Sequence, residues 1–114
     1  MTLLNDVQVW TPACRYEFLI PNRGVGVLLP DGAQAALFRL DDGSLYAVGN
    51  IDPFSGAAVM SRGIVGDRGG RAAVQTPIKK QAFALDDGGC LDDQDIALPV
   101  YATRVVDGYV EVGV

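Results

Sequence analysis

Apolar and polar positions alternate over short stretches of this chain, and turn signals separate the stretches. This pattern is typical of β-strands. Four Asp-Gly dipeptides mark the turns, at residues 31–32, 42–43, 87–88 and 107–108. No window holds the i, i+3, i+4, i+7 apolar spacing of an amphipathic helix. The chain is therefore predicted to be all-β.

Two hairpins are the clearest local predictions. Residues 35–48 contain two apolar stretches on either side of Asp41-Asp42-Gly43, and residues 99–112 turn at Asp107-Gly108. An Asp-Gly pair between alternating apolar residues is a strong short-range hairpin signal. The last strand of the second hairpin alternates strictly between apolar and other residues, so we expect one of its faces to be buried.

Shorter stretches predict further strands. Residues 7–10 alternate and are followed by Thr11-Pro12, so a first strand is expected to end there, at a sheet edge. Residues 25–29 are predicted to form a short buried strand. Residues 82–85 lead into a second hairpin-type turn at residues 86–89.

The composition indicates a single soluble domain that spans residues 1–114. Hydrophobic residues make up 49% of the chain and charged residues 20%, which is ordinary for a globular protein. No apolar run approaches the length of a membrane span, and the N-terminus lacks the basic and apolar regions of a signal peptide. Two cysteines are too few for a disulfide framework. We expect a cytoplasmic protein that contacts no membrane.

The formal net charge of −5 argues against nucleic-acid binding, which depends on basic residues that neutralise phosphates. The charge is unevenly distributed. Residues 62–80 contain one aspartate and five basic residues, whereas residues 86–95 contain five aspartates and no basic residue. Solvated loops would explain this distribution, and so would a basic docking face for an acidic partner surface.

The chain has no histidine, and this excludes several kinds of chemistry. A Ser-His-Asp triad, a Cys-His pair, a His-ligated zinc site and a histidine general base all require that residue. Cys14 and Cys90 do not form a Cys-x-x-Cys motif, and the paired aspartates lie in or beside turns, where aspartate bonds the backbone. No nucleotide-binding glycine motif is present. We expect that this chain alone catalyses no reaction.

Two loop-like segments, residues 50–54 (NIDPF) and 76–80 (TPIKK), flank a glycine-rich stretch. This arrangement resembles the cluster-binding region of Rieske [2Fe–2S] domains, in which two such loops face each other across the cluster. There the loops read Cys-Pro-His and Cys-Pro-x-His. The resemblance implies an antiparallel β-sandwich with an inserted two-loop subdomain at about residues 50–91.

The four positions that would bind the cluster are changed. Asp52 and Phe54 stand where the first Cys and His would be, and Thr76 and Lys79 stand where the second pair would be. A Rieske centre needs two thiolates on one iron and two imidazoles on the other. The resemblance therefore implies a Rieske-like fold whose cluster site has been refilled by other side chains, with no cofactor in this chain.

Further segments narrow the resemblance. They are residues 36–39 (ALFR), 52–57 (DPFSGA), 61–67 (SRGIVGD), 77–85 (PIKKQAFAL) and 89–91 (GCL). As a set they resemble the small subunit of assimilatory NAD(P)H-dependent nitrite reductase, over almost the whole chain. Each segment alone would be weak evidence.

This resemblance implies a role in a two-subunit oxidoreductase that reduces nitrite to ammonium. The large subunit of such enzymes carries FAD, siroheme and a [4Fe–4S] cluster. The small subunit is then expected to be a non-redox accessory chain that binds the large subunit, and the choice between NADH and NADPH belongs to that partner. The alternative is a stand-alone Rieske-like binding or regulatory domain with no catalytic role.

Two hypotheses concern the refilled site. Asp52 and Lys79 occupy opposed ligand positions, so we expect them to lie close together and to form an ion pair across the two loops. The alternative is that Asp52 only caps its own loop.

A third hypothesis concerns docking. The segment from residue 61 to residue 71 is predicted to contact the large subunit or to border its active-site mouth. The residues proposed for this surface are Arg62, Arg68, Arg71 and Lys80. When isolated, the chain is expected to be able to self-associate, for example through an edge strand.

Overall fold

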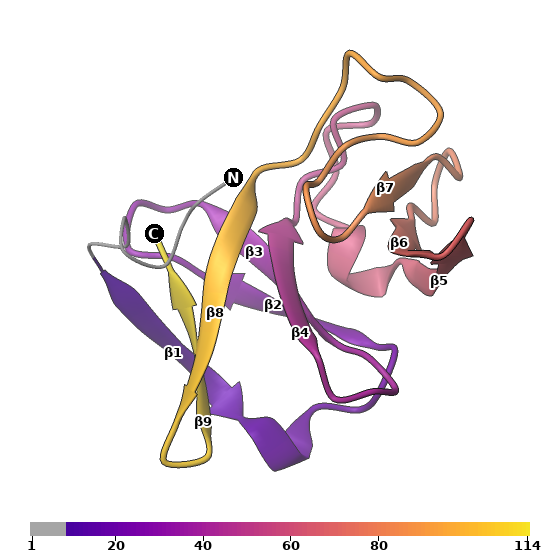
Figure 1. The fold of residues 1–114 in the computed structure, drawn as a ribbon. Helices are drawn as coiled ribbons and strands as arrows, with labels where there is room; N and C mark the ends of the chain where they lie inside the picture. The colour runs from indigo at the N-terminus through magenta and orange to yellow at the C-terminus, as the bar shows by residue number, and fades with distance from the viewer. Residues whose placement is uncertain (1–8) are drawn as a thin grey trace.

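The computed structural model describes residues 9–114, which form two antiparallel sheets (Figure 1). The larger sheet has the strand order β1-β9-β8-β4-β3-β2. Its strands are β1 (Trp10–Arg15), β2 (Gly24–Leu28), β3 (Gln34–Arg39), β4 (Leu45–Gly49), β8 (Val100–Val106) and β9 (Tyr109–Gly113). The smaller sheet has the order β5-β6-β7, with β5 (Ile64–Arg68), β6 (Arg71–Gln75) and β7 (Ala82–Ala84). Two short 3₁₀ helices complete the fold, η2 (Tyr16–Phe18) and η3 (Met60–Arg62). The all-β prediction is confirmed.

Both predicted hairpins form. β3 and β4 pair with Phe38 opposite Tyr46, and β8 and β9 pair with Val105 opposite Val110. Asp107 and Gly108 have φ angles of 52° and 79° at the second turn. Positive φ at both central residues is the signature of a type I′ turn, whose twist matches that of the strands it joins.

The smaller sheet is carried by the segment between β4 and β8. These two strands are neighbours in the larger sheet, with Ala47 opposite Tyr101 and Val48 opposite Val100. The chain therefore leaves the larger sheet after Gly49, builds the two loops and the smaller sheet, and returns. Figure 1 shows the smaller sheet to one side of the larger one, near the end of β4.

Strand β3 is buried on both faces and joins the two layers of the core. Leu37 packs in a cluster with Val110 on the face toward β9. Phe38 points to the opposite face and packs in a second cluster with Val74 and Phe83 of the smaller sheet. Alternate side chains of a strand point to opposite faces, so one strand can serve both clusters.

The first strand lies further along the chain than predicted. β1 does not end at Thr11-Pro12 but continues to Arg15, and its register with β9 shifts between Pro12 and Cys14. Proline is tolerated here because β1 is an edge strand, where no further strand needs its missing N–H. Residues 7 and 8 of the predicted strand lie outside the described residues.

The prediction of a buried strand at residues 25–29 was only partly right, because Val27 and Leu29 are buried but the residues beside them are not. β2 is the other edge strand of the larger sheet, and only Val27 within it is buried. Val25 is 38% exposed and Leu28 is 71% exposed. A short apolar run indicates a strand but does not say whether other elements cover it.

The glycine-rich stretch between the two loops is a hairpin. β5 and β6 pair from Ile64–Gln75 to Arg68–Arg71, and the turn residues Gly69 and Gly70 have φ angles of 60° and 89°. In the sequence, the dipeptide Gly69-Gly70 between two strand-like stretches is the pattern that indicates a two-residue hairpin turn.

Gly24 is the point at which β2 meets the segment after the first loop. A Cβ atom at this position would lie 2.6 Å from the Ser61 carbonyl oxygen and 2.6 Å from Cε1 of Phe38. The close approach of two backbones therefore requires glycine, and it fixes η3 against the start of β2.

We expect Gly24→Ala to lower the free energy of unfolding by about 1–3 kcal/mol, because neither the Ser61 backbone nor the buried Phe38 ring has room to move away. Gly66→Ala is the matched control, since a Cβ at Gly66 would meet no atom within 4 Å and its φ is not positive. Urea unfolding of both variants measures the difference. Equal midpoints for the two would show that the contact is not needed.

Candidate two-loop site and its charged surroundings

A buried hydrogen bond joins the two loops. The first loop, residues 50–59, connects β4 to η3, and the second loop, residues 76–81, connects β6 to β7. The Thr76 hydroxyl donates to Oδ2 of Asp52 over 3.0 Å, and both residues are fully buried. The sequence resemblance matches these two positions to the cysteines of the Rieske pattern. The structure thus brings the two residues together, through a hydroxyl and a carboxylate.

Asp52 also closes its own loop. Its Oδ1 accepts the backbone N–H of Phe54 over 2.9 Å, and its Oδ2 accepts the Ser55 hydroxyl over 2.8 Å. Burial acts to raise the pKa of the Asp52 carboxyl, but these hydrogen bonds and that from Thr76 outweigh it, and the pKa lies below its ordinary value. Asp52 therefore does cap its own loop, but the alternative that it only does so is wrong, because the same carboxylate also binds the second loop through Thr76.

The predicted ion pair between Asp52 and Lys79 was wrong. Lys79 is exposed, and among residues 9–114 no ion pair joins it to Asp52. The physical reason is desolvation: an ammonium group brought beside the buried carboxylate would lose its hydration, whereas the Thr76 hydroxyl bonds the carboxylate without burying a second charge.

Phe54 fills space at the position of the first Rieske histidine. Its ring is partly buried and tilted against that of Phe83, with ring centroids 6.2 Å apart. The contact joins the first loop to β7 and extends the core cluster of the smaller sheet. Such a pair stabilises by about 0.5–1.5 kcal/mol beyond the area that it buries.

Asn50 anchors the start of the first loop to its end, a role that no motif in the sequence indicated. Its Nδ2 donates to Oε1 of Gln34 over 3.1 Å, and its Oδ1 accepts the backbone N–H of Ser61 over 2.8 Å. The backbone N–H of Met60 donates to the Asn50 carbonyl oxygen over 3.0 Å. Asn50 therefore sets the position of η3 and of Arg62, its last residue.

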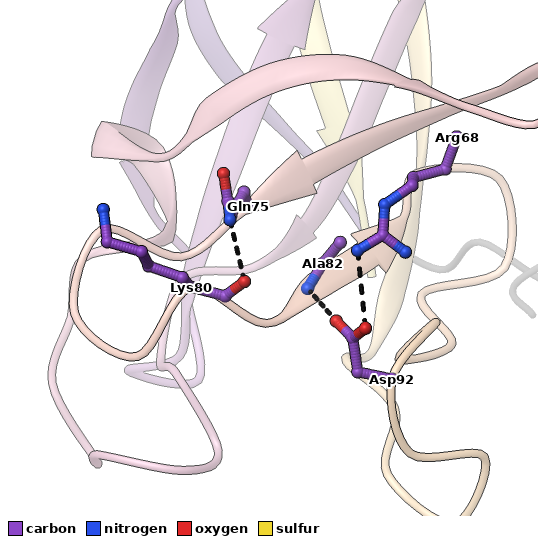
Figure 2. Close-up of polar contacts among 5 residues, drawn as sticks. All are labelled: Arg68, Gln75, Lys80, Ala82 and Asp92. Atoms are coloured by element: carbon purple, nitrogen blue, oxygen red, sulfur yellow. Dashed lines mark hydrogen bonds and ion pairs between the residues drawn. The ribbon is translucent and has the colours of Figure 1, made fainter.

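The second loop is closed by side-chain and backbone hydrogen bonds. Nε2 of Gln75 donates to the Lys80 carbonyl oxygen over 2.9 Å (Figure 2), and the Thr76 N–H donates to the Gln81 carbonyl oxygen over 2.9 Å. Lys80 has a φ of 65°, a left-handed conformation that is uncommon outside glycine. Its ammonium group points away from the loop closure in Figure 2.

Two of the arginines predicted for docking have partners inside the chain. Arg68 donates to Oδ1 of Asp92 over 3.4 Å, and the same carboxylate accepts the Ala82 N–H over 2.9 Å (Figure 2). Arg71 forms ion pairs with Asp86 over 2.6 Å and with Asp87 over 3.2 Å. The acidic segment 86–95 thus folds back on the β5–β6 hairpin and neutralises part of its charge. Pairs as exposed as these contribute little to stability, because water screens both charges.

Arg62 and Lys80, the other two predicted docking residues, are exposed. Neither forms an ion pair within residues 9–114. Arg62 lies in η3, beside the start of β2, whereas Lys80 lies in the second loop. The structure therefore does not gather the four docking residues into one uniformly basic face.

The side chains at the refilled site do not match a Rieske cluster. The four positions offer a carboxylate, a phenyl ring, a hydroxyl and an ammonium group, in place of two thiolates and two imidazoles. Among residues 9–114 no three Cys, His, Asp or Glu side chains group together in a way that could hold a metal ion.

In the same range no helix is long and apolar enough to cross a membrane.

We expect Thr76→Val to lower the free energy of unfolding by about 1–3 kcal/mol, because it leaves a buried carboxylate oxygen with one donor fewer. Thr76→Ser keeps the hydroxyl and is the matched control. Chemical denaturation of both variants gives the difference. A valine variant as stable as the serine variant would show that the hydrogen bond between the loops contributes nothing.

Comparison with known proteins identifies the family. The model of the Rieske-like [2Fe-2S] domain family matches residues 9–113. The nitrite reductase (NADH) small subunit of Escherichia coli (strain K12) is 39% identical over 103 residues, which cover 90% of this chain and 94% of that one. A crystal structure from Mycobacterium tuberculosis, described as an NADH-dependent nitrite reductase small subunit, is 72% identical, with a TM-score of 0.93 over 96% of this chain and 97% of that chain.

A third relative has a different architecture. The nitrite reductase [NAD(P)H] large subunit of Klebsiella oxytoca is 38% identical over 104 residues, which cover 91% of this chain but only 11% of that protein. A domain like this one is therefore part of a much longer chain there. By its fold, its family match and its similarity over nearly its full length, the chain belongs to the nitrite reductase (NADH) small subunit family, within the Rieske-like [2Fe-2S] domain proteins.

Proposed function

We propose that this chain is an accessory subunit that binds the large subunit of a cytoplasmic NAD(P)H-dependent nitrite reductase. The partner would carry FAD, siroheme and a [4Fe–4S] cluster, and the complex would reduce nitrite to ammonium. The observation that carries the proposal is the Klebsiella oxytoca relative, in which a domain like this one is built into the large subunit itself. A domain that occurs both as a separate chain and fused to a large subunit is expected to work in contact with it.

We also infer that the contribution of this chain is structural and that it holds no Rieske cluster. The support is chemical, since the chain has no histidine and its two loops are tied by the Thr76–Asp52 hydrogen bond and by the Phe54–Phe83 contact. A cluster would otherwise supply that cross-link. The loops can thus keep a Rieske-like shape for docking without any redox group.

The purified full chain is expected to contain far less than one iron atom per molecule, and to show no iron–sulfur absorption and no electron paramagnetic resonance signal after reduction. A Rieske ferredoxin expressed and purified in parallel, under iron-replete conditions, is the positive control. Two irons per chain with a reduced-state signal would disprove the inference.

Tagged chain is expected to co-purify with its cognate large subunit and to raise NAD(P)H-dependent nitrite reduction above that of the large subunit alone. Nitrite loss and ammonium formation are measured with and without the chain, with NADH and with NADPH as donors. No binding together with full activity of the large subunit alone would rule out the accessory role. It would favour the alternative of a stand-alone binding or regulatory domain.

A further inference from the structure

Two arginines whose side chains have no partner among residues 9–114 line the same groove. The other arginines all have one: Arg15, Arg68, Arg71 and Arg104 form ion pairs, and Arg39 donates to the Leu19 carbonyl oxygen and lies over the Tyr16 ring. Within the part of the chain that the structure describes, Arg23 and Arg62 form no ion pair or hydrogen bond through their side chains. In a chain with a net charge of −5, two such neighbouring cations are unusual.

The backbone contact at Gly24 is what brings them together. Arg23 precedes Gly24 at the start of β2, and Arg62 follows Ser61 in η3. The Ser61 carbonyl oxygen lies against Gly24. Both arginines line one groove of about 360 Å³, and Ile64, which is 62% exposed, adds an apolar wall to it. The groove is therefore lined by two arginines and by an exposed apolar side chain.

The groove adjoins an open sheet edge. Beyond the β2 end of the β2–β3 pair, the Leu29 N–H donates to the Ala33 carbonyl oxygen. Beyond the β4 end of the β3–β4 pair, the Asn50 N–H donates to the Gln34 carbonyl oxygen. Hydrogen bonds alternate along an antiparallel strand, so odd-numbered residues of β3 bond β2 and even-numbered residues bond β4. In β2 the residues that bond β3 are then 25 and 27. The N–H and C=O groups of residues 24, 26 and 28 point outward.

This edge lacks the devices that usually block pairing. β2 reads Gly-Val-Gly-Val-Leu, with no charged residue and no proline, and its register with β3 is regular throughout. Edge strands that must stay unpaired commonly carry a lysine, a proline or a bulge. The opposite edge of the sheet, β1, has both a proline and a register shift.

We propose that β2 and the Arg23–Arg62 groove together bind one extended acidic segment of the large subunit. The segment adds a strand beside β2 through backbone hydrogen bonds, and it places a carboxylate between the two arginines. Backbone pairing supplies affinity in such complexes, and side-chain contacts supply specificity. Charge complementarity selects an acidic segment, because guanidinium groups bind carboxylates through paired hydrogen bonds. The identity of the partner rests on the proposed function.

Gly26 allows a sharp test of the strand pairing. Gly26→Pro removes an outward N–H that has no hydrogen bond among residues 9–114, whereas Gly26→Ala keeps that N–H. A Cβ at this position would meet only Nδ2 of Asn50, at 4.0 Å, so the alanine methyl group fits. Proline is tolerated on an edge strand where its missing N–H would face outward. We expect the proline variant to bind the holo large subunit about tenfold more weakly. The alanine variant is expected to bind within about twofold of the original chain.

Charge reversal tests the groove. Arg23→Glu and Arg62→Glu are each expected to weaken binding at least about tenfold, and more at low salt, because each places a carboxylate against the acidic segment. Arg15→Glu is the matched control: it makes the same charge change at an exposed position on β1, the far edge of the sheet, and is expected to bind within about twofold of the original. Thermal midpoints of all variants confirm that they are folded.

Binding of full-length chain to holo large subunit is measured by calorimetry, and the mass of the isolated chain by light scattering. If the original chain binds and neither Gly26→Pro nor the two reversals weakens binding beyond their controls, this inference is overturned and the proposed function stands. If the original chain does not bind, both fail. A dimer of the isolated chain that Gly26→Pro dissociates, with large-subunit binding unchanged, would assign the β2 edge to a second copy and overturn the inference.

Discussion

The Asp52 carboxylate is the group on which the arrangement of the loops depends. A buried charge is tolerated only when hydrogen-bond donors surround it. Donors from the first loop and the Thr76 hydroxyl of the second meet this need together. The position of each loop is therefore coupled to that of the other. A Rieske cluster would join such loops through metal bonds, whereas here a charged hydrogen bond and an aromatic contact do so.

The loop geometry carries through to the larger sheet. Asn50 lies at the end of β4, and its hydrogen bonds to Gln34 and Ser61 fix η3 over the start of β2. Gly24 lets the two backbones touch. Through these contacts, the η3 segment, which packs in the core of the smaller sheet, also forms one side of the groove at the edge of the larger sheet.

Electrostatic pairing divides the basic residues into two sets. The acidic segment after β7 neutralises Arg68 and Arg71, so these arginines hold the β5–β6 hairpin against that segment. Arg23 and Arg62 have no such partner among the described residues, and both line the groove where η3 meets the start of β2. Among the described residues, positive charge without an internal ion pair thus lies at this groove and at the exposed Lys79 and Lys80 of the second loop.

The sequence by itself determined the features that short stretches encode. Asp-Gly turns between alternating apolar residues predicted the β3–β4 and β8–β9 hairpins, and loop motifs indicated the Rieske-like family. The tertiary structure decided which strands became edges, that Thr76 and not Lys79 meets Asp52, and that Arg68 pairs with Asp92. The physical reason is range: turn chemistry and periodicity act between near neighbours, whereas these contacts join segments far apart in the chain and are selected by desolvation and packing in the finished fold.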